Sequence, residues 1–192
     1  MNQKKGKLTH KELCLLGARW VFNESYSVEK DPWRILIEPG FREEMPDVFA
    51  FNKYHSVLIE CKTSRADFLA DKKKPFRQNP QLGIGQRRFY LVNEGVATQD
   101  EMPDRWQLLI AYDKNTILLP EDYFSPTSWD CGNLYDFNIR NATNEIDLMW
   151  SWNYRKEHDC LPVFPVERPN LIHPGYWKQE GWLEKNIPLE AT

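Results

Sequence analysis

The sequence predicts an α/β domain with a mixed β-sheet flanked by helices, followed by an irregular, aromatic-rich C-terminal extension. Short apolar runs bounded by turn residues predict strands, and apolar residues at helical spacing predict helices before and between them. Because helices and strands alternate over residues 1–120, we expect one α/β core there. A chain of 192 residues is long enough for such a core.

Two helices are expected in this core. The first covers residues 9–23, where apolar side chains recur at helical spacing and Thr9 and Glu12 have the S/T-x-x-E spacing of a capping box. The second begins after Ser64, a suitable N-cap, and ends before Pro75, which cannot continue a helix. Its last turn is rich in lysine, which the helix dipole favours.

The expected strands cover residues 34–38, 47–52, 56–62, 87–93, 106–112 and 116–120. Residues 76–85, with two glycines, are expected to form a loop. A tight connection joins the second and third strands. If their hairpin is centred between Lys53 and Tyr54, Asp47 lies opposite Glu60.

The composition changes after Pro120. Residues 121–192 hold twelve acidic and six basic residues and five of the eight tryptophans, and one helix is expected over residues 143–157. We therefore divide the chain into a core, residues 1–120, and an extension of unknown role, residues 121–192, which we expect to pack on the core.

The net charge of −3 hides a basic segment. Residues 62–88 carry eight Lys or Arg against two acids. A local basic patch on an acidic protein suits a focused phosphate-binding site, although most such runs are solvated helix faces. The basic residues expected to line such a phosphate-binding site are Arg65, Lys72, Lys73, Lys74, Arg77, Arg87 and Arg88.

Acidic side chains within strands are the clearest chemical signal. Side chains alternate along a strand, so Glu60 and Lys62 share one face while Cys61 lies on the other. Like charges at Asp47 and Glu60 would repel each other. A hard divalent cation would relieve that repulsion, with the main-chain carbonyl of Cys61 as a third ligand; alternatively Lys62 neutralises part of the pair.

These residues resemble a known family. Pro46-Asp47 followed by Glu60-Cys61-Lys62 resembles the PD-(D/E)xK nuclease superfamily. The segments IECKTSRADFLADKKKP, RRFYLVNEGV and WQLLIAY look like its MmcB-like DNA-repair group, and the similarity covers about residues 8–120. The chain departs from some members because it has no acid on the 34–38 strand other than Glu38.

The resemblance implies a restriction-endonuclease-like core and Mg²⁺- or Mn²⁺-dependent hydrolysis of DNA. Asp47 and Glu60 would bind the metal, and Lys62 would orient or activate the attacking water. Glu12 stands where many members carry an additional metal-binding acid, but it equally suits the capping box with Thr9. Gln86 or Arg87 could reach the scissile phosphate, although a surface position at a strand start explains them as well.

Three functions are therefore considered. The first is a Mg²⁺-dependent endo- or exodeoxyribonuclease of DNA repair or of phage or bacterial DNA processing, acting as a monomer or homodimer. The second is a catalytically inactive nucleic-acid-binding or repair-accessory protein with the same fold. The third is a phage interaction protein whose acidic extension binds a protein partner.

Three other sequence patterns give weaker predictions, on location, zinc binding and Cys61. No apolar run approaches the roughly 18 residues of a membrane helix and no signal core follows the basic N-terminus, so we expect a cytoplasmic protein with reduced thiols. The spacing of Cys131, His158, Cys160 and His173 does not suit zinc. Cys61 is expected to be a buried thiol rather than a nucleophile.

Overall fold

Seven strands form one curled, mixed sheet in the computed structural model, which describes residues 7–24, 32–40, 44–121, 123, 136–158 and 169–172. The strands lie side by side in chain order. The β1–β2, β2–β3 and β5–β6 pairs are antiparallel, and the β3–β4, β4–β5 and β6–β7 pairs are parallel. Their bounds are β1 Arg34–Ile37, β2 Val48–Phe51, β3 Ser56–Lys62, β4 Arg87–Asn93, β5 Trp106–Asp113, β6 Thr116–Leu118 and β7 Asn170–Ile172.

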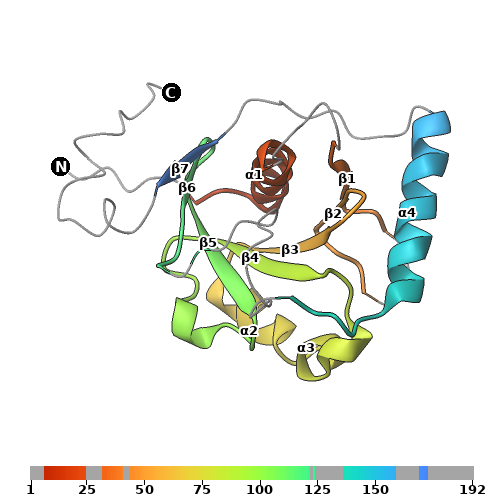
Figure 1. Cartoon of the computed structure of the whole chain (residues 1–192). Helices are drawn as coiled ribbons and strands as arrows, with labels where there is room; N and C mark the ends of the chain where they lie inside the picture. The colour runs from red at the N-terminus through yellow and green to blue at the C-terminus, as the bar shows by residue number, and fades with distance from the viewer. Residues whose placement is uncertain are drawn as a thin grey trace, which may run out of the picture.

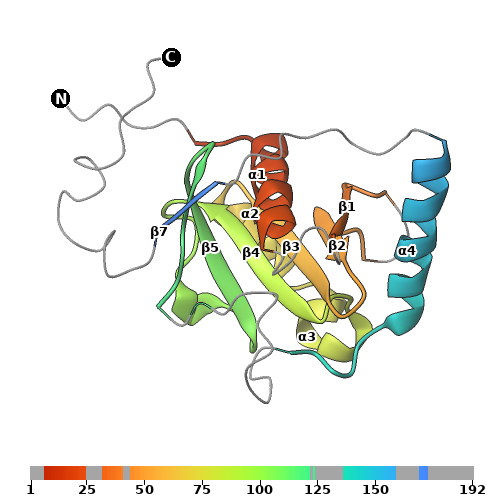
Figure 2. The ribbon, with the colours of Figure 1, turned by 45° about the horizontal axis from the view of Figure 1, so that its top comes forward.

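The helices cover both faces of this sheet. Helix α1 lies on one face and α2 and α3 on the other, while α4 stands beside β1 and β2 (Figure 1). A second view shows β5 and β7 at the end of the sheet away from α4 (Figure 2). The expected α/β fold with a mixed sheet is thus confirmed. The helices are α1 His10–Asn23, α2 Arg65–Asp71, α3 Pro75–Gln78 and α4 Ala142–Glu157, with 3₁₀ turns at Pro80–Leu82 and Gln99–Glu101.

Local sequence signals explain the start of each helix in the core. The Thr9 hydroxyl accepts a hydrogen bond from the backbone of Glu12, whose carboxylate accepts one from the backbone N–H of Thr9, so the capping box is confirmed. Ser64 accepts from the backbone of Asp67 and caps α2 as expected.

The hairpin register is also confirmed. Val48 pairs with Ile59 and Phe51 with Ser56, so the next pair places Asp47 opposite Glu60. Side chains of β3 alternate between two buried layers. Ile59 and Cys61 pack beneath α1, and Leu58 belongs to the layer on the α2 side.

Three expectations on local structure were wrong. Residues 76–85 were expected to form a loop, but they contain most of α3 and the 3₁₀ turn at Pro80–Leu82, because each proline fits the start of a helical turn. We expected Pro75 to end the second helix, but α2 ends at Asp71 and Pro75 opens α3, because a proline fits the first position of a helix. Strand β7 was not predicted, because Asn170–Ile172 is too short to show alternation and is completed only by pairing with β6.

Part of the extension packs on the core. The backbone N–H of Phe137 donates to the carbonyl of Gln86, and that of Asn141 donates to the carbonyl of Gly83. Gly85 has φ of +82°, and a Cβ atom there would lie 2.6 Å from the Leu58 side chain. The loop before β4 is therefore closely fitted to the sheet, and only glycine suits its tightest point.

Candidate active site

Asp47, Glu60 and Lys62 come together where β2 begins and β3 ends. The Lys62 Nζ atom lies 2.8 Å from Glu60 Oε2 and 3.6 Å from Asp47 Oδ2. One ammonium group therefore contacts both carboxylates of the expected site. The hairpin register and the alternation of β3 place these side chains on one side of the sheet.

Asp47 is held by the main chain of the neighbouring strand. Its Oδ2 accepts a 2.7 Å hydrogen bond from the backbone N–H of Cys61, and its side chain is 17% exposed. Burial and the charge of Glu60 raise the pKa of Asp47 to about 6, against the opposing effect of Lys62. This carboxylate thus lacks full compensation for its charge. The expected role of the Cys61 carbonyl as a metal ligand stays a prediction.

Glu60 and Lys62 are almost fully buried, with 1% and 5% of their surfaces exposed. Burial opposes the charged ammonium, but Glu60, Asp71 and Asp47 together raise the pKa of Lys62 above its usual range. Lys62 is therefore a cation at neutral pH, suited to electrostatic stabilisation and unsuited to accepting a proton.

Two further buried residues join this site: Asp71, which the sequence did not single out, and Arg77, which was expected to contact nucleic acid. Asp71 ends α2 with 2% exposure, and its Oδ1 lies 3.4 Å from Lys62 Nζ. Arg77 Nε donates to Asp71 Oδ2 at 2.8 Å, and Tyr90 donates its hydroxyl to the same oxygen at 2.6 Å. Burial would raise the pKa of Asp71, but Arg77 and Lys62 hold it well below its usual range.

Arg77 also pairs with two further acids. Its Nη2 lies 2.9 Å from Glu60 Oε1, outside hydrogen-bonding geometry, and its Nη1 donates to Glu44. Glu44 is 2% exposed, and burial raises its pKa against the effect of Arg77. We call the set formed by Glu44, Asp47, Glu60, Lys62, Asp71 and Arg77 the acid-rich network. Beyond Asp47, Glu60 and Lys62, the sequence offered one further signal for this network in Asp71, an acid within a basic run.

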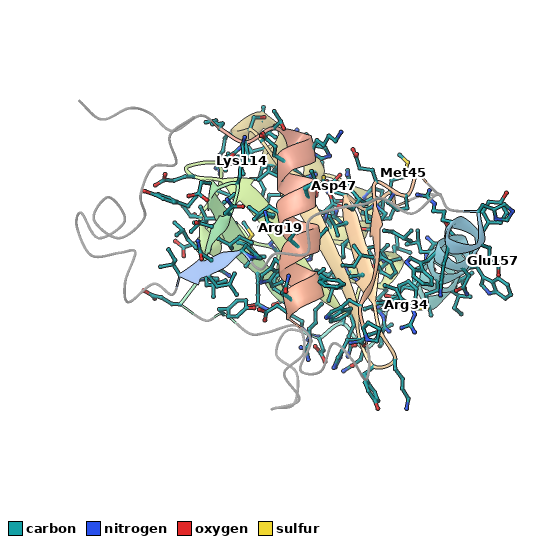
Figure 3. The ribbon with its side chains drawn as sticks, turned by 90° about the horizontal axis from the view of Figure 1, so that it is seen from above. Arg19, Arg34, Met45, Asp47, Lys114 and Glu157 are labelled. Atoms are coloured by element: carbon teal, nitrogen blue, oxygen red, sulfur yellow. The ribbon has the colours of Figure 1, made fainter. Side chains whose placement is uncertain are left out.

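Glu12 lies apart from this network. Its carboxylate oxygens contact Thr9 and Lys114, with Lys114 Nζ at 3.5 Å. Figure 3 shows Lys114 on one side of α1 and Asp47 on the other. The geometry supports the capping role, and the expectation that Glu12 completes the metal site is corrected, because residue 12 lies on the wrong side of the helix. The residue of α1 that faces Asp47 is His10, with Nε2 3.4 Å from Asp47 Oδ1.

The expected basic surface needs a larger correction. Arg77, Arg87 and Arg88 are 6%, 1% and 1% exposed, so they cannot form an open phosphate-binding face. Arg87 Nε donates to Asp136 at 2.8 Å, and Gln86 donates to the same carboxylate at 3.0 Å. Acids outside the basic segment pair with Arg77 and Arg87, while Arg88 donates to the carbonyls of Gly85 and Pro80; the local charge count could not show either arrangement.

The remaining basic residues lie on α2 and just after it. Lys73 is exposed, and Lys74 is partly exposed with its Nζ 2.5 Å from Asp71 Oδ1. Arg65 pairs with the Glu101 carboxylate, and Lys72 donates to the carbonyl of Glu101. A smaller cationic surface therefore remains, formed by Arg65, Lys72, Lys73 and Lys74.

A second set of buried charges joins the extension to the core. Glu145 Oε1 accepts from Ser56, Gly85 and Arg140 at 2.7–3.0 Å. Together with Arg87 and Asp136 it forms what we call the balanced network: Arg87, Asp136, Arg140 and Glu145.

On α4, Trp150 and Tyr154 are 70% and 63% exposed, while Trp152 contacts Phe51. A protein partner for the extension stays a prediction. Cys131, Cys160 and His173 lie outside the described residues.

The carboxylates of Asp47 and Glu60 are suitable ligands for a divalent cation, but both already have cationic partners. Asp47 is partly exposed and its pKa is raised, whereas Glu60 Oε1 already faces Arg77 Nη2 at 2.9 Å and Asp71 Oδ1 faces Lys74 Nζ at 2.5 Å. Lys62 also contacts both Asp47 and Glu60. A cation shared by these two carboxylates would have to displace the ammonium group from them.

Comparisons with known proteins give the fold alone. No protein-family model and no curated protein matches the chain. Among solved structures it resembles SPO1766, a protein of unknown function from Silicibacter pomeroyi, with a TM-score of 0.52 and 20% identity over 83% of this chain and 90% of that chain. None of the helices in the described ranges combines the length and apolar character of a bilayer crossing.

Proposed function

We propose that this chain is a divalent-metal-dependent nuclease of the PD-(D/E)xK type that hydrolyses DNA phosphodiester bonds. One observation carries the proposal: Asp47, Glu60 and Lys62 converge at the β2–β3 hairpin, in the register that the sequence predicts. A helix precedes these strands and another follows them, as the resemblance implies.

Each residue has a role in this proposal. Asp47 and Glu60 would hold Mg²⁺ or Mn²⁺, which when bound polarises a phosphoryl oxygen and lowers the pKa of its water. Lys62 stays protonated and supplies positive charge beside the developing phosphorane. Because its pKa is raised, Lys62 positions the water and the phosphate rather than removing a proton.

A second candidate rests on a different observation. Glu60 is 1% exposed, with Lys62 and Arg77 against its two carboxylate oxygens. Such closed pairing suits a structural ion network, and hence the inactive DNA-binding protein considered above. Both candidates use the cationic surface of α2, so DNA binding alone does not separate them.

A cleavage panel separates the two candidates. Wild type, Asp47→Asn and Lys62→Met are incubated with duplex, single-stranded and branched DNA and with RNA, in Mg²⁺ or Mn²⁺. Asp104→Asn, which removes an 87% exposed carboxylate, is the matched control. We expect cleavage by wild type and the control, and a loss of about a hundredfold or more in the two site variants.

Folding and binding are checked alongside. Circular dichroism shows that each variant is folded, and DNA affinity measured at several salt concentrations shows whether the cationic surface acts. Salt-sensitive binding without cleavage by wild type supports the accessory protein. Cleavage that Asp47→Asn leaves intact contradicts the proposed site.

A further inference from the structure

The first two turns of α1 and the residue that follows β1 bring three different metal-ligating side chains together. His10 Nε2 lies 3.5 Å from Cys14 Sγ and 3.4 Å from Glu38 Oε1. The three ligand atoms all lie within 4.8 Å of one another. His10 and Cys14 are one helical turn apart, so α1 itself sets their spacing.

We propose that His10, Cys14 and Glu38 form a binding site for a zinc-like divalent cation, separate from the proposed Mg²⁺ position. In a tetrahedral site with metal–ligand distances of about 2.0–2.3 Å, neighbouring ligand atoms lie roughly 3.3–3.7 Å apart. Both contacts of His10 Nε2 fall in that range. Three protein ligands leave a fourth position for water.

Asp47 stands at the border of this site. Its Oδ1 lies 3.4 Å from the same imidazole nitrogen, while its Oδ2 faces Lys62. One carboxylate therefore faces the His10 cluster with one oxygen and the acid-rich network with the other. A cation at His10 would also compensate charge on Asp47.

The ligand types select the ion. Imidazole and thiolate are ligands for Zn²⁺, Co²⁺ and similar ions, whereas Mg²⁺ is held by oxygen. Cys14 is fully buried and loses its proton to solvent as it binds the metal, while His10 and Glu38 are 39% and 56% exposed. The cation would therefore enter from the His10 and Glu38 side.

The backbone of Glu38 adopts a left-handed conformation where β1 ends. Its φ of +43° is uncommon for a residue with a side chain, and its N–H donates to the carbonyl of Asp47 at 2.9 Å. This conformation ends β1 and holds the Glu38 carboxylate beside α1.

Cobalt binding tests the site without any cleavage assay. Metal-free, reduced protein is titrated with Co²⁺, and the thiolate-to-cobalt charge-transfer band is followed in the near ultraviolet. We expect one equivalent to give the band in wild type and an excess of Mg²⁺ to leave it unchanged. Zn²⁺ should displace the cobalt.

Two variants make the result specific. Cys14→Ser should lose the band, and Glu38→Gln, an exposed change that spares the core, should weaken Zn²⁺ affinity by about tenfold or more. Asp104→Asn, the matched loss of an exposed carboxylate, should bind as wild type does. A band that persists in Cys14→Ser, or Zn²⁺ affinity unaffected by Glu38→Gln, overturns the proposal.

The outcome is independent of the nuclease. Lys62→Met should retain the cobalt band even where it abolishes cleavage. Mg²⁺-dependent cleavage by a protein that binds neither Co²⁺ nor Zn²⁺ would reject this site and leave the proposed function standing. Cobalt binding by a protein that cleaves no DNA would support this site and count against the proposed nuclease function.

Discussion

The acid-rich network and the balanced network are both largely buried, but they differ in the ratio of cations to carboxylates. In the balanced network Arg87 faces Asp136 and Arg140 faces Glu145, one cation for each acid. In the acid-rich network four carboxylates surround two buried cations, Lys62 and Arg77, and the partly exposed Lys74.

The two networks differ in how far their buried charges are compensated, and we use that difference to distinguish structural charges from those of the proposed active site. Paired buried charges hold elements in place, as Glu145 holds α4 against the loop before β4. Surplus buried charge destabilises a fold unless something else compensates it. Burial first, and then the charge of Glu60, raise the pKa of Asp47, which belongs to the acid-rich network. Four substitutions test this contrast.

The largest effect is expected for Arg77→Met. It leaves the buried acids Glu44, Glu60 and Asp71 without their common partner, so the free energy of unfolding should fall by about 3–5 kcal/mol. Urea denaturation measures the loss. Lys74→Met, at a side chain that is 41% exposed, is the control and should cost less than about 1 kcal/mol. Equal losses would contradict a central role for Arg77.

Glu145→Ala should have the next largest effect. It removes the shared acceptor of the Ser56 hydroxyl, the Gly85 N–H and Arg140 Nε, and we expect a loss of about 3 kcal/mol in the free energy of unfolding. Glu157→Ala, an exposed change on the same helix, should leave the urea midpoint unchanged. If both variants unfold at the same urea concentration, Glu145 does not anchor the extension.

Asp47→Asn should shift stability in the opposite direction. Because the folded-state pKa of Asp47 is raised to about 6, the native state binds the proton more tightly than the unfolded chain. Its contribution therefore lowers wild-type stability as pH rises from about 4 to about 6. Above pH 7, without divalent metal, the variant should be more stable than wild type by roughly 1–3 kcal/mol.

Urea midpoints measured between pH 4 and pH 8 check this sign. The urea midpoint of Asp47→Asn should rise relative to that of wild type as the pH increases from about 4 to about 6, and the difference should then stay constant. A variant less stable than wild type at pH 8 would mean that Asp47 is a satisfied structural carboxylate, as in the balanced network.

The smallest effect is expected for Arg65→Ala. Its partner Glu101 has a pKa lowered to about 2, chiefly by the hydrogen bond from Arg65, but the pair lies at the surface where water and salt screen it. The urea midpoint should stay within error of wild type at both low and high salt. A clear loss at low salt would show that the surface pairs of α2 also hold the fold.

Much of the site could be predicted because its signals are local. The alternation along β3 placed Glu60 and Lys62 on one face, and the short hairpin placed Asp47 opposite Glu60. The capping box and the start of α2 were equally readable. Glu12 shows the limit, since one spacing suited both a cap and a ligand and only its direction from α1 decided between them.

By itself, then, the sequence determined the α/β class, the hairpin register and the identity of the three central residues, because strand alternation and turn length act between near neighbours. Only the tertiary structure decided which charges are buried and with what they pair. Glu44 meets Arg77 across 33 residues and Arg87 meets Asp136 across 49, through packing of the sheet against its covering segments. A sequence shows each charge, but folding chooses its partner and its exposure to water.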